Sequence, residues 1–113
     1  MLIALHSVIA DGRIDDYRRE HERVPDDLAE LFARAGVHDW RIWRSGDRLF
    51  HLVDCDDFDA AMAVIRADPA DERWQARIGR FVDGFRGPDG EDAYRALETV
   101  WTLSSQRGEG APA

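Results

Sequence analysis

The chain has 113 residues, 44% of them hydrophobic, which fits one small globular domain and excludes an intrinsically disordered protein. Its net charge of −8 excludes the basic surface that nucleic-acid binding requires. All 15 basic residues are Arg, so Schiff-base chemistry and phosphate-binding loops that depend on lysine are excluded as well.

The first half of the chain predicts a strand, a long helix and a hairpin. Residues 2–9 form a short apolar run that ends at an Asp-Gly turn signal, which favours a buried strand. Across residues 13–35, apolar side chains recur at steps of three and four, as on one face of a helix, and Gly36 is placed to cap its end. Residues 37–44 alternate in character, and a Ser-Gly-Asp turn joins them to a second strand at residues 48–54.

The second half predicts two helices and a last strand. Asp56 or Asp57 caps a short helix that follows the hairpin. The pair Asp68-Pro69 starts another helix, whose apolar side continues as far as Phe85. A loop rich in Gly, Pro and Asp then spans residues 84–92, and the last strand is expected at residues 97–103.

This order of elements is the β-α-β-β-α-β arrangement of ferredoxin-like folds. It predicts one α+β domain over residues 1–104, with an antiparallel sheet and helices on one of its faces, and a flexible polar tail over residues 105–113. The other face of the sheet would expose apolar side chains, which is costly and favours aggregation. We therefore expect a homodimer in which two sheets face each other.

Metal, cofactor and membrane binding are not indicated. Cys55 is the single cysteine, and no Cys and His spacing is typical of a zinc site. The carboxylates at residues 54–59 lack the Gly and the final Glu of a calcium-binding loop. No apolar run reaches the roughly 20 residues of a membrane span, and the opening run lacks the positive flank of a signal peptide. We expect a cytoplasmic protein without a metal or cofactor.

His21 lies on the apolar face of the predicted first helix, one turn after Tyr17. Because side chains four residues apart are neighbours on a helix, the hydroxyl and the imidazole would share one face. Pro25 lacks the N–H that would bond to the His21 carbonyl, so the helix is either kinked there or broken at Val24 and restarted. A core histidine also fits this position, but the irregular backbone and the nearby hydroxyl favour a site.

Two of the four tryptophans are candidates for a ligand site. Large aromatic side chains mostly fill cores and interfaces, yet sugar sites also use aromatic faces against the C–H surface of a pyranose. Trp40 and Trp74 are open to both interpretations. The other tryptophans and the strand histidines are assigned to packing or to the surface: Trp43, Trp101, His6, His38 and His51.

Three short motifs occur in an order and spacing found in one known family. They are Y-R-R-E-H at residues 17–21, A-G-V-H-D-W at residues 35–40 and R-W-Q at residues 73–75. Together with the apolar segment at residues 97–103, they resemble the L-rhamnose mutarotase family over roughly residues 2–104. Each motif is weak by itself, but the combination is fairly specific.

The resemblance implies a dimeric α/β barrel of ferredoxin-like subunits, without a metal, that interconverts the α and β anomers of a monosaccharide. It implies that His21 is the acid/base residue, and that the sugar is contacted by Tyr17, Trp40, Trp74 and Gln75. L-rhamnose or a related 6-deoxy-L-hexose such as L-fucose is the expected substrate, and a pentose is a competitor.

Three positions depart from the family pattern and bear on the identity of the sugar. Residues 24–26 read Val-Pro-Asp instead of Ile-Trp-Pro, Trp40 replaces a tyrosine and brings an N–H donor, and Gln75 replaces a second tryptophan. Two other classes of protein stay open, because a fold does not decide function. One is a small monooxygenase on the same dimeric barrel, and the other is a non-catalytic ligand-binding dimerisation module.

Overall fold

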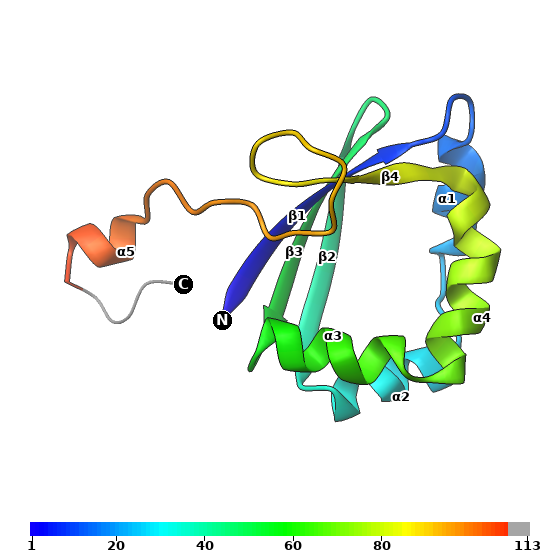
Figure 1. Ribbon diagram of the computed structural model, residues 1–113, viewed down its shortest axis with the longest axis horizontal. Helices are drawn as coiled ribbons and strands as arrows, with labels where there is room; N and C mark the ends of the chain where they lie inside the picture. Colours follow the sequence, from blue (N-terminus) through cyan, green and yellow to red (C-terminus); the bar gives the residue numbers. More distant parts are fainter. Residues whose placement is uncertain (109–113) are drawn as a thin grey trace.

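The computed structural model describes residues 1–108, which form a four-stranded sheet with its helices (Figure 1). The elements, in chain order, are β1 (Leu2–Ile9), α1 (Ile14–Glu20), α2 (Asp26–Arg34), β2 (Val37–Ser45), β3 (Arg48–Cys55), α3 (Phe58–Arg66), α4 (Pro69–Ile78), the 3-10 helix η1 (Gly79–Phe81), β4 (Val82–Arg86) and α5 (Leu103–Gln106). Residues 109–113 of the expected tail lie outside the described residues, and α5 occupies part of what precedes them. The division into a domain and a tail therefore stays a prediction.

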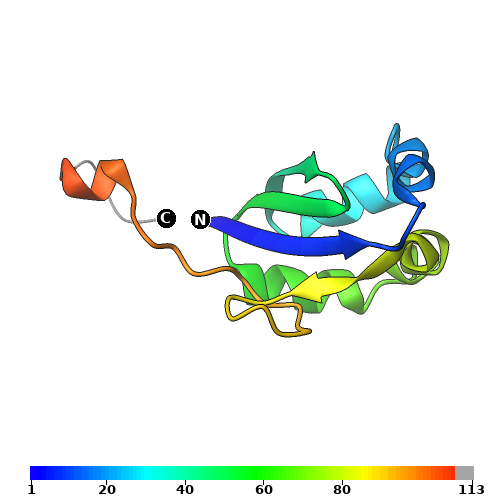
Figure 2. The same ribbon diagram turned by 90° about the horizontal axis from the view of Figure 1, so that it is seen from above.

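The sheet has the strand order β2-β3-β1-β4, and every neighbouring pair is antiparallel. Helices α2, α3 and α4 lie on one side of it, with α1 at one end (Figures 1 and 2). This arrangement confirms the predicted ferredoxin-like α+β fold.

The last strand is not at residues 97–103, as the sequence had suggested. The strand beside β1 is β4, which pairs Phe85 with Ser7. The prediction was wrong because the spacing of Ile78, Phe81 and Phe85, at steps of three and four, is that of one helix face. In the structure these residues belong to the end of α4, to η1 and to β4, so β4 was predicted as a continuation of the helix. The later segment joins the sheet only through the Leu97 N–H, which donates to the carbonyl of Ala4 at 2.8 Å.

The predicted long first helix is broken beside His21. Helix α1 ends at Glu20 and α2 begins at Asp26, so the helix breaks and restarts instead of kinking, but the break is at His21 and not at Val24. Pro25 is the residue before α2, with an extended backbone (φ −57°, ψ 144°), because its ring cannot continue a helix from the preceding turn. His21 consequently closes the end of α1 instead of lying in the middle of a helix.

The hydrophobic core lies between the sheet and the helices. Leu5 and Val53 from the sheet and Leu28 and Leu31 from α2 are completely buried in its main cluster. A smaller cluster at the α1 end of the sheet contains Ile9, Tyr17, Leu49 and Phe81. Through these two clusters, α1 and α2 pack against the same face of the sheet.

The opposite face of the sheet leaves apolar side chains uncovered. Side chains alternate between the two faces of a strand, and since Leu49 and His51 are buried toward the helices, Phe50 points the other way. Phe50 is 41% exposed and its pairing partner Trp43 is 53% exposed. The segment after β4 carries α5 away from the body of the domain (Figures 1 and 2). Trp101 on that segment is exposed, so its assignment to packing in a last strand was wrong.

Candidate active site

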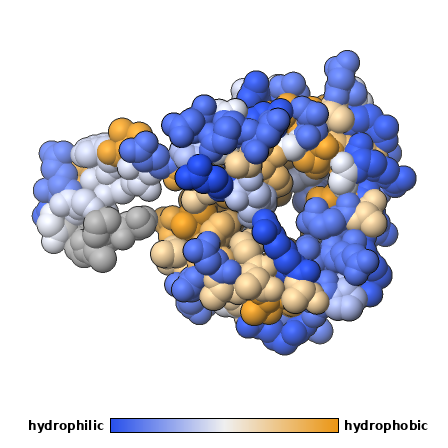
Figure 3. Space-filling model, in the orientation of Figure 1, coloured by the Kyte–Doolittle hydropathy of each residue, from blue (hydrophilic) through white to orange (hydrophobic). Residues whose placement is uncertain are grey.

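A cavity of about 610 Å³ lies between the sheet and the helices. The molecule is visibly hollowed in this region in the space-filling view (Figure 3). All five residues that the sequence proposed for a site line this one cavity: Tyr17, His21, Trp40, Trp74 and Gln75. A cavity of this size and largely apolar lining is typical of a small-molecule site.

His21 has a ring nitrogen available to a ligand. Its Nδ1 lies 2.9 Å from the carbonyl oxygen of Tyr17, and since a carbonyl only accepts, Nδ1 carries the hydrogen. The neutral ring therefore has its lone pair on Nε2. Burial lowers the pKa of His21 below its ordinary value of 6.5, while the Tyr17 carbonyl and the charge of Glu20 act in the opposite direction. At neutral pH the ring is a neutral base of fixed tautomer.

Two aromatic rings hold the His21 imidazole in place. Tyr17 stacks on it with ring centroids 4.1 Å apart, and Trp74 meets it edge-on at 5.0 Å. Tyr17 is buried, its hydroxyl has no hydrogen-bond partner within residues 1–108, and burial raises the pKa of Tyr17 far above its ordinary value. The hydroxyl thus stays protonated and can donate to a ligand.

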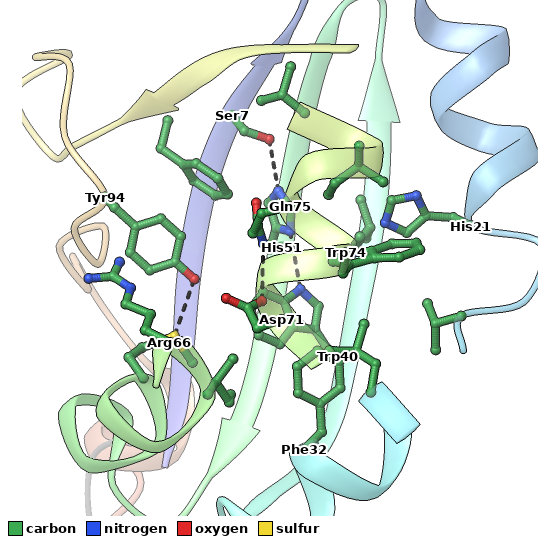
Figure 4. A pocket seen from close by; sticks show the side chains of 18 of the residues that line it. Ser7, His21, Phe32, Trp40, His51, Arg66, Asp71, Trp74, Gln75 and Tyr94 are labelled. Atoms are coloured by element: carbon green, nitrogen blue, oxygen red, sulfur yellow. Dashed lines mark hydrogen bonds between the residues drawn. The ribbon is translucent and has the colours of Figure 1, made fainter. Parts of the chain in front are cut away.

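A buried chain of hydrogen bonds joins Trp40, His51 and Ser7 at the centre of the cavity (Figure 4). The Trp40 Nε1–H donates to His51 Nδ1 at 3.1 Å, so Nδ1 must accept. The neutral ring then carries its hydrogen on Nε2, which donates to Ser7 Oγ at 2.9 Å. Burial, with lesser effects of His21 and His6, lowers the pKa of His51 to about 4, so the ring stays neutral at physiological pH.

This chain of hydrogen bonds changes two sequence interpretations. His51 was assigned to packing or the surface, and it is buried as expected for packing, but it also lines the cavity. The indole N–H of Trp40 is engaged by His51, so Trp40 offers a ligand its aromatic face and not a donor. Ser7 and His51 look like a nucleophile and its base, but His51 donates to Ser7 and therefore cannot take its proton.

A second polar group comes from the α3–α4 side of the cavity (Figure 4). Gln75 donates through Nε2 to Asp71 Oδ1 at 3.3 Å, one turn earlier on α4. Arg66 lies over the Tyr94 ring, 4.7 Å from its centroid, and the Tyr94 hydroxyl donates to the sulfur of Met62.

Sequence reasoning did not find five of the polar or aromatic residues in the cavity: Ser7, His51, Arg66, Asp71 and Tyr94. A usable signal existed for His51, which alternates with Leu49 and Val53 on the inward face of its strand.

The described part of the chain contains neither a cluster of potential metal ligands nor a membrane-spanning helix. Within residues 1–108, no three His, Cys, Asp or Glu side chains are grouped so as to hold a metal ion. No helix in the same range is both long enough and apolar enough to cross a membrane.

Comparison with known proteins gives concordant matches. The family model described as L-rhamnose mutarotase matches residues 2–103. An L-rhamnose mutarotase from Burkholderia cenocepacia (strain HI2424) is 29% identical over 103 residues, which is 89% of this chain and 96% of that protein. An L-fucose mutarotase from Xanthomonas campestris pv. campestris is 32% identical over 96 residues, 82% of this chain and 76% of that protein. The crystal structure of L-rhamnose mutarotase FA22100 from Formosa agariphila has a similar fold, with a TM-score of 0.71 at 16% identity, covering 91% of this chain and 98% of that one.

Proposed function

Since the chain belongs to the L-rhamnose mutarotase family, we propose that it is a sugar mutarotase, an isomerase that interconverts the α and β anomers of L-rhamnose or a related 6-deoxy-L-hexose such as L-fucose. The family match favours this activity over a monooxygenase or a non-catalytic module. The observation that carries the proposed mechanism is the Nε2 lone pair of His21, held beside Tyr17 and Trp74 on a cavity of suitable size.

The proposed reaction needs one base that can return its proton. Neutral His21 removes the proton from the anomeric hydroxyl, and the C–O bond to the ring oxygen breaks as the carbonyl forms. The imidazolium of His21 returns this proton to the ring oxygen, and the open aldehyde rotates about its bond to C2. Closure on the other face of the aldehyde reverses these proton transfers, so none is consumed. An imidazole serves both directions because its pKa lies near working pH.

The other lining residues support sugar binding in this proposal. The face of Trp40, packed beside Phe32 with centroids 5.7 Å apart, can cover the C–H surface of a pyranose. The Tyr17 hydroxyl and the Gln75 amide supply hydrogen bonds to sugar hydroxyls. The activity is tested by saturation-transfer NMR on a panel of L-sugars. Exchange between anomer resonances should accelerate on adding the protein for at least one 6-deoxy-L-hexose.

The pH dependence of exchange should reveal the neutral form of His21. Protonation of Nε2 removes the lone pair, so kcat/KM should fall as the pH is lowered through the pKa of His21. Because burial lowers the pKa of this group from 6.5, the midpoint should lie below 6.5. Exchange rates measured by NMR from pH 4 to 8 would give the pH of this midpoint. A midpoint clearly above 6.5 would be incompatible with a buried His21 base.

We also propose that the protein is a homodimer. Trp43 and Phe50 are exposed on the helix-free face of the sheet, where a second sheet would cover them. Light scattering at micromolar concentration should give twice the 12.9 kDa mass of one chain, and Phe50→Arg should reduce it to one chain. Wild-type protein found only as a 12.9 kDa species would show that this face stays uncovered.

A further inference from the structure

Asp71 presents a buried carboxylate to the cavity without a cation to pair with it. The residue is 9% exposed, and within residues 1–108 no Arg or His nitrogen lies at ion-pair distance from it. Among the described residues its side chain has a single hydrogen-bond partner, the Gln75 amide, which donates to Oδ1 at 3.3 Å. Oδ2 has no partner in that range and is open to the cavity. A buried carboxylate without an ion pair costs free energy unless a ligand donates hydrogen bonds to it.

Asp71 does not serve as the N-terminal cap of its helix. Asp71 is the third residue of α4, where a carboxylate often caps the helix. The cap here is Asp68, whose Oδ1 accepts from the Ala70 N–H at 2.9 Å, and the Asp71 side chain accepts no backbone N–H of residues 1–108. The neighbouring Glu72 is exposed and supplies negative charge to the first turn from solvent.

The cation that shares the cavity does not neutralise Asp71. Arg66 is held over the ring of Tyr94 and makes no ion pair with any described carboxylate. In Figure 4 a hydrogen bond joins the Asp71 carboxylate to the Gln75 amide, and Trp40 and Trp74 line the same cavity. The pair therefore presents hydrogen-bonding groups to a ligand between aromatic side chains.

We propose that Asp71 binds two neighbouring hydroxyl groups of a neutral sugar and, with Gln75 beside it, determines which sugar the site accepts. This inference rests on the proposed mutarotase function. A carboxylate is an acceptor with about four lone-pair sites, so Oδ2 and the free side of Oδ1 can each take one hydroxyl hydrogen. A sugar that lacks one of these hydroxyls would leave the carboxylate unpaired, and such sites discriminate strongly.

The test compares Asp71→Asn with wild type in the NMR exchange assay, with sugar concentration varied to separate KM from kcat. Loss of a charged acceptor should raise KM on the best sugar by about 10- to 100-fold. The value of kcat should change only a few-fold, because His21 is untouched. Glu72→Gln is the matched control: it removes a carboxylate from the same turn of α4 but outside the cavity, and it should leave KM unchanged.

Stability supplies an independent readout. Asn is isosteric with Asp and removes an unpaired buried charge, so Asp71→Asn should melt at the same temperature as wild type or higher. A clearly lower melting temperature would show that the charge is structural and would overturn the inference. Discrimination between the best sugar and its epimers should also become weaker in Asp71→Asn than in wild type.

The result separates this inference from the proposed function. If Asp71→Asn keeps the wild-type KM and epimer preference while His21→Ala loses exchange, Asp71 does not touch the sugar and the mutarotase function stands. If wild type accelerates exchange of no sugar in the panel, both are overturned.

Discussion

Replacing His21 by alanine is expected to slow anomer exchange at least about 100-fold, the lower end of what general acid–base catalysis contributes. The reason is geometric: Nε2 of His21 is the ring nitrogen left free by the bond from Nδ1 to the Tyr17 carbonyl. The variant should fold, because a half-buried imidazole is a small part of the core. Saturation-transfer NMR on the best sugar measures the loss, and circular dichroism checks the fold.

Two comparison variants make the His21 result specific. His38→Ala removes an exposed histidine that pairs with Asp56 and does not line the cavity, so exchange should stay at the wild-type rate. Tyr17→Phe keeps the ring that stacks on His21 and removes only a hydroxyl, so its effect should be milder than that of His21→Ala. Full exchange by His21→Ala would show that His21 is a core residue and that the proposed mechanism is wrong.

Leu31→Ala is expected to lower the free energy of unfolding by about 2–5 kcal/mol. Leu31 is completely buried in the main core cluster, and its truncation leaves a cavity between α2 and the sheet. Helix α2 has nine residues, too few to be stable alone, so its docking through such side chains holds it in place. Urea unfolding followed by circular dichroism gives the change.

The control for this variant lies on the same helix. Glu30 is exposed and makes no ion pair with the described residues, so Glu30→Ala should change stability by less than about 0.5 kcal/mol. Equal effects of the two substitutions would mean that α2 is not held by its buried face. Because α2 also forms the Phe32 side of the cavity, Leu31→Ala should additionally weaken sugar binding.

The residues that share a helix face were the part of the site that the sequence could predict. Helical spacing placed Tyr17 and His21 together, and the proline placed the irregularity beside them, because both signals are local. Their meeting with Trp40 and Trp74 came from the family resemblance, since no local pattern brings β2 and α4 to one cavity. The structure places all four there.

The sequence predictions were wrong or incomplete at residues whose structure and role depend on tertiary contacts. The spacing of Ile78, Phe81 and Phe85 suits a helix, but pairing with β1 makes Phe85 part of a strand. Asp71 is one of two acidic residues in the first turn of α4, a placement common to many helices, and only its burial and the lack of a paired cation within residues 1–108 distinguish it. The engagement of the Trp40 N–H by His51 depends on two strands lying side by side.

The placement of the tryptophans gives the native chain a built-in optical probe. Trp40 and Trp74 line the cavity, whereas Trp43 and Trp101 are not among the residues that line it and contribute a constant background. A sugar that enters the cavity replaces water around two of the four indoles, so the fluorescence emission of the unlabelled protein should shift on binding. Such a titration measures occupancy without turnover, which makes inactive variants such as His21→Ala as accessible to binding measurements as the wild type.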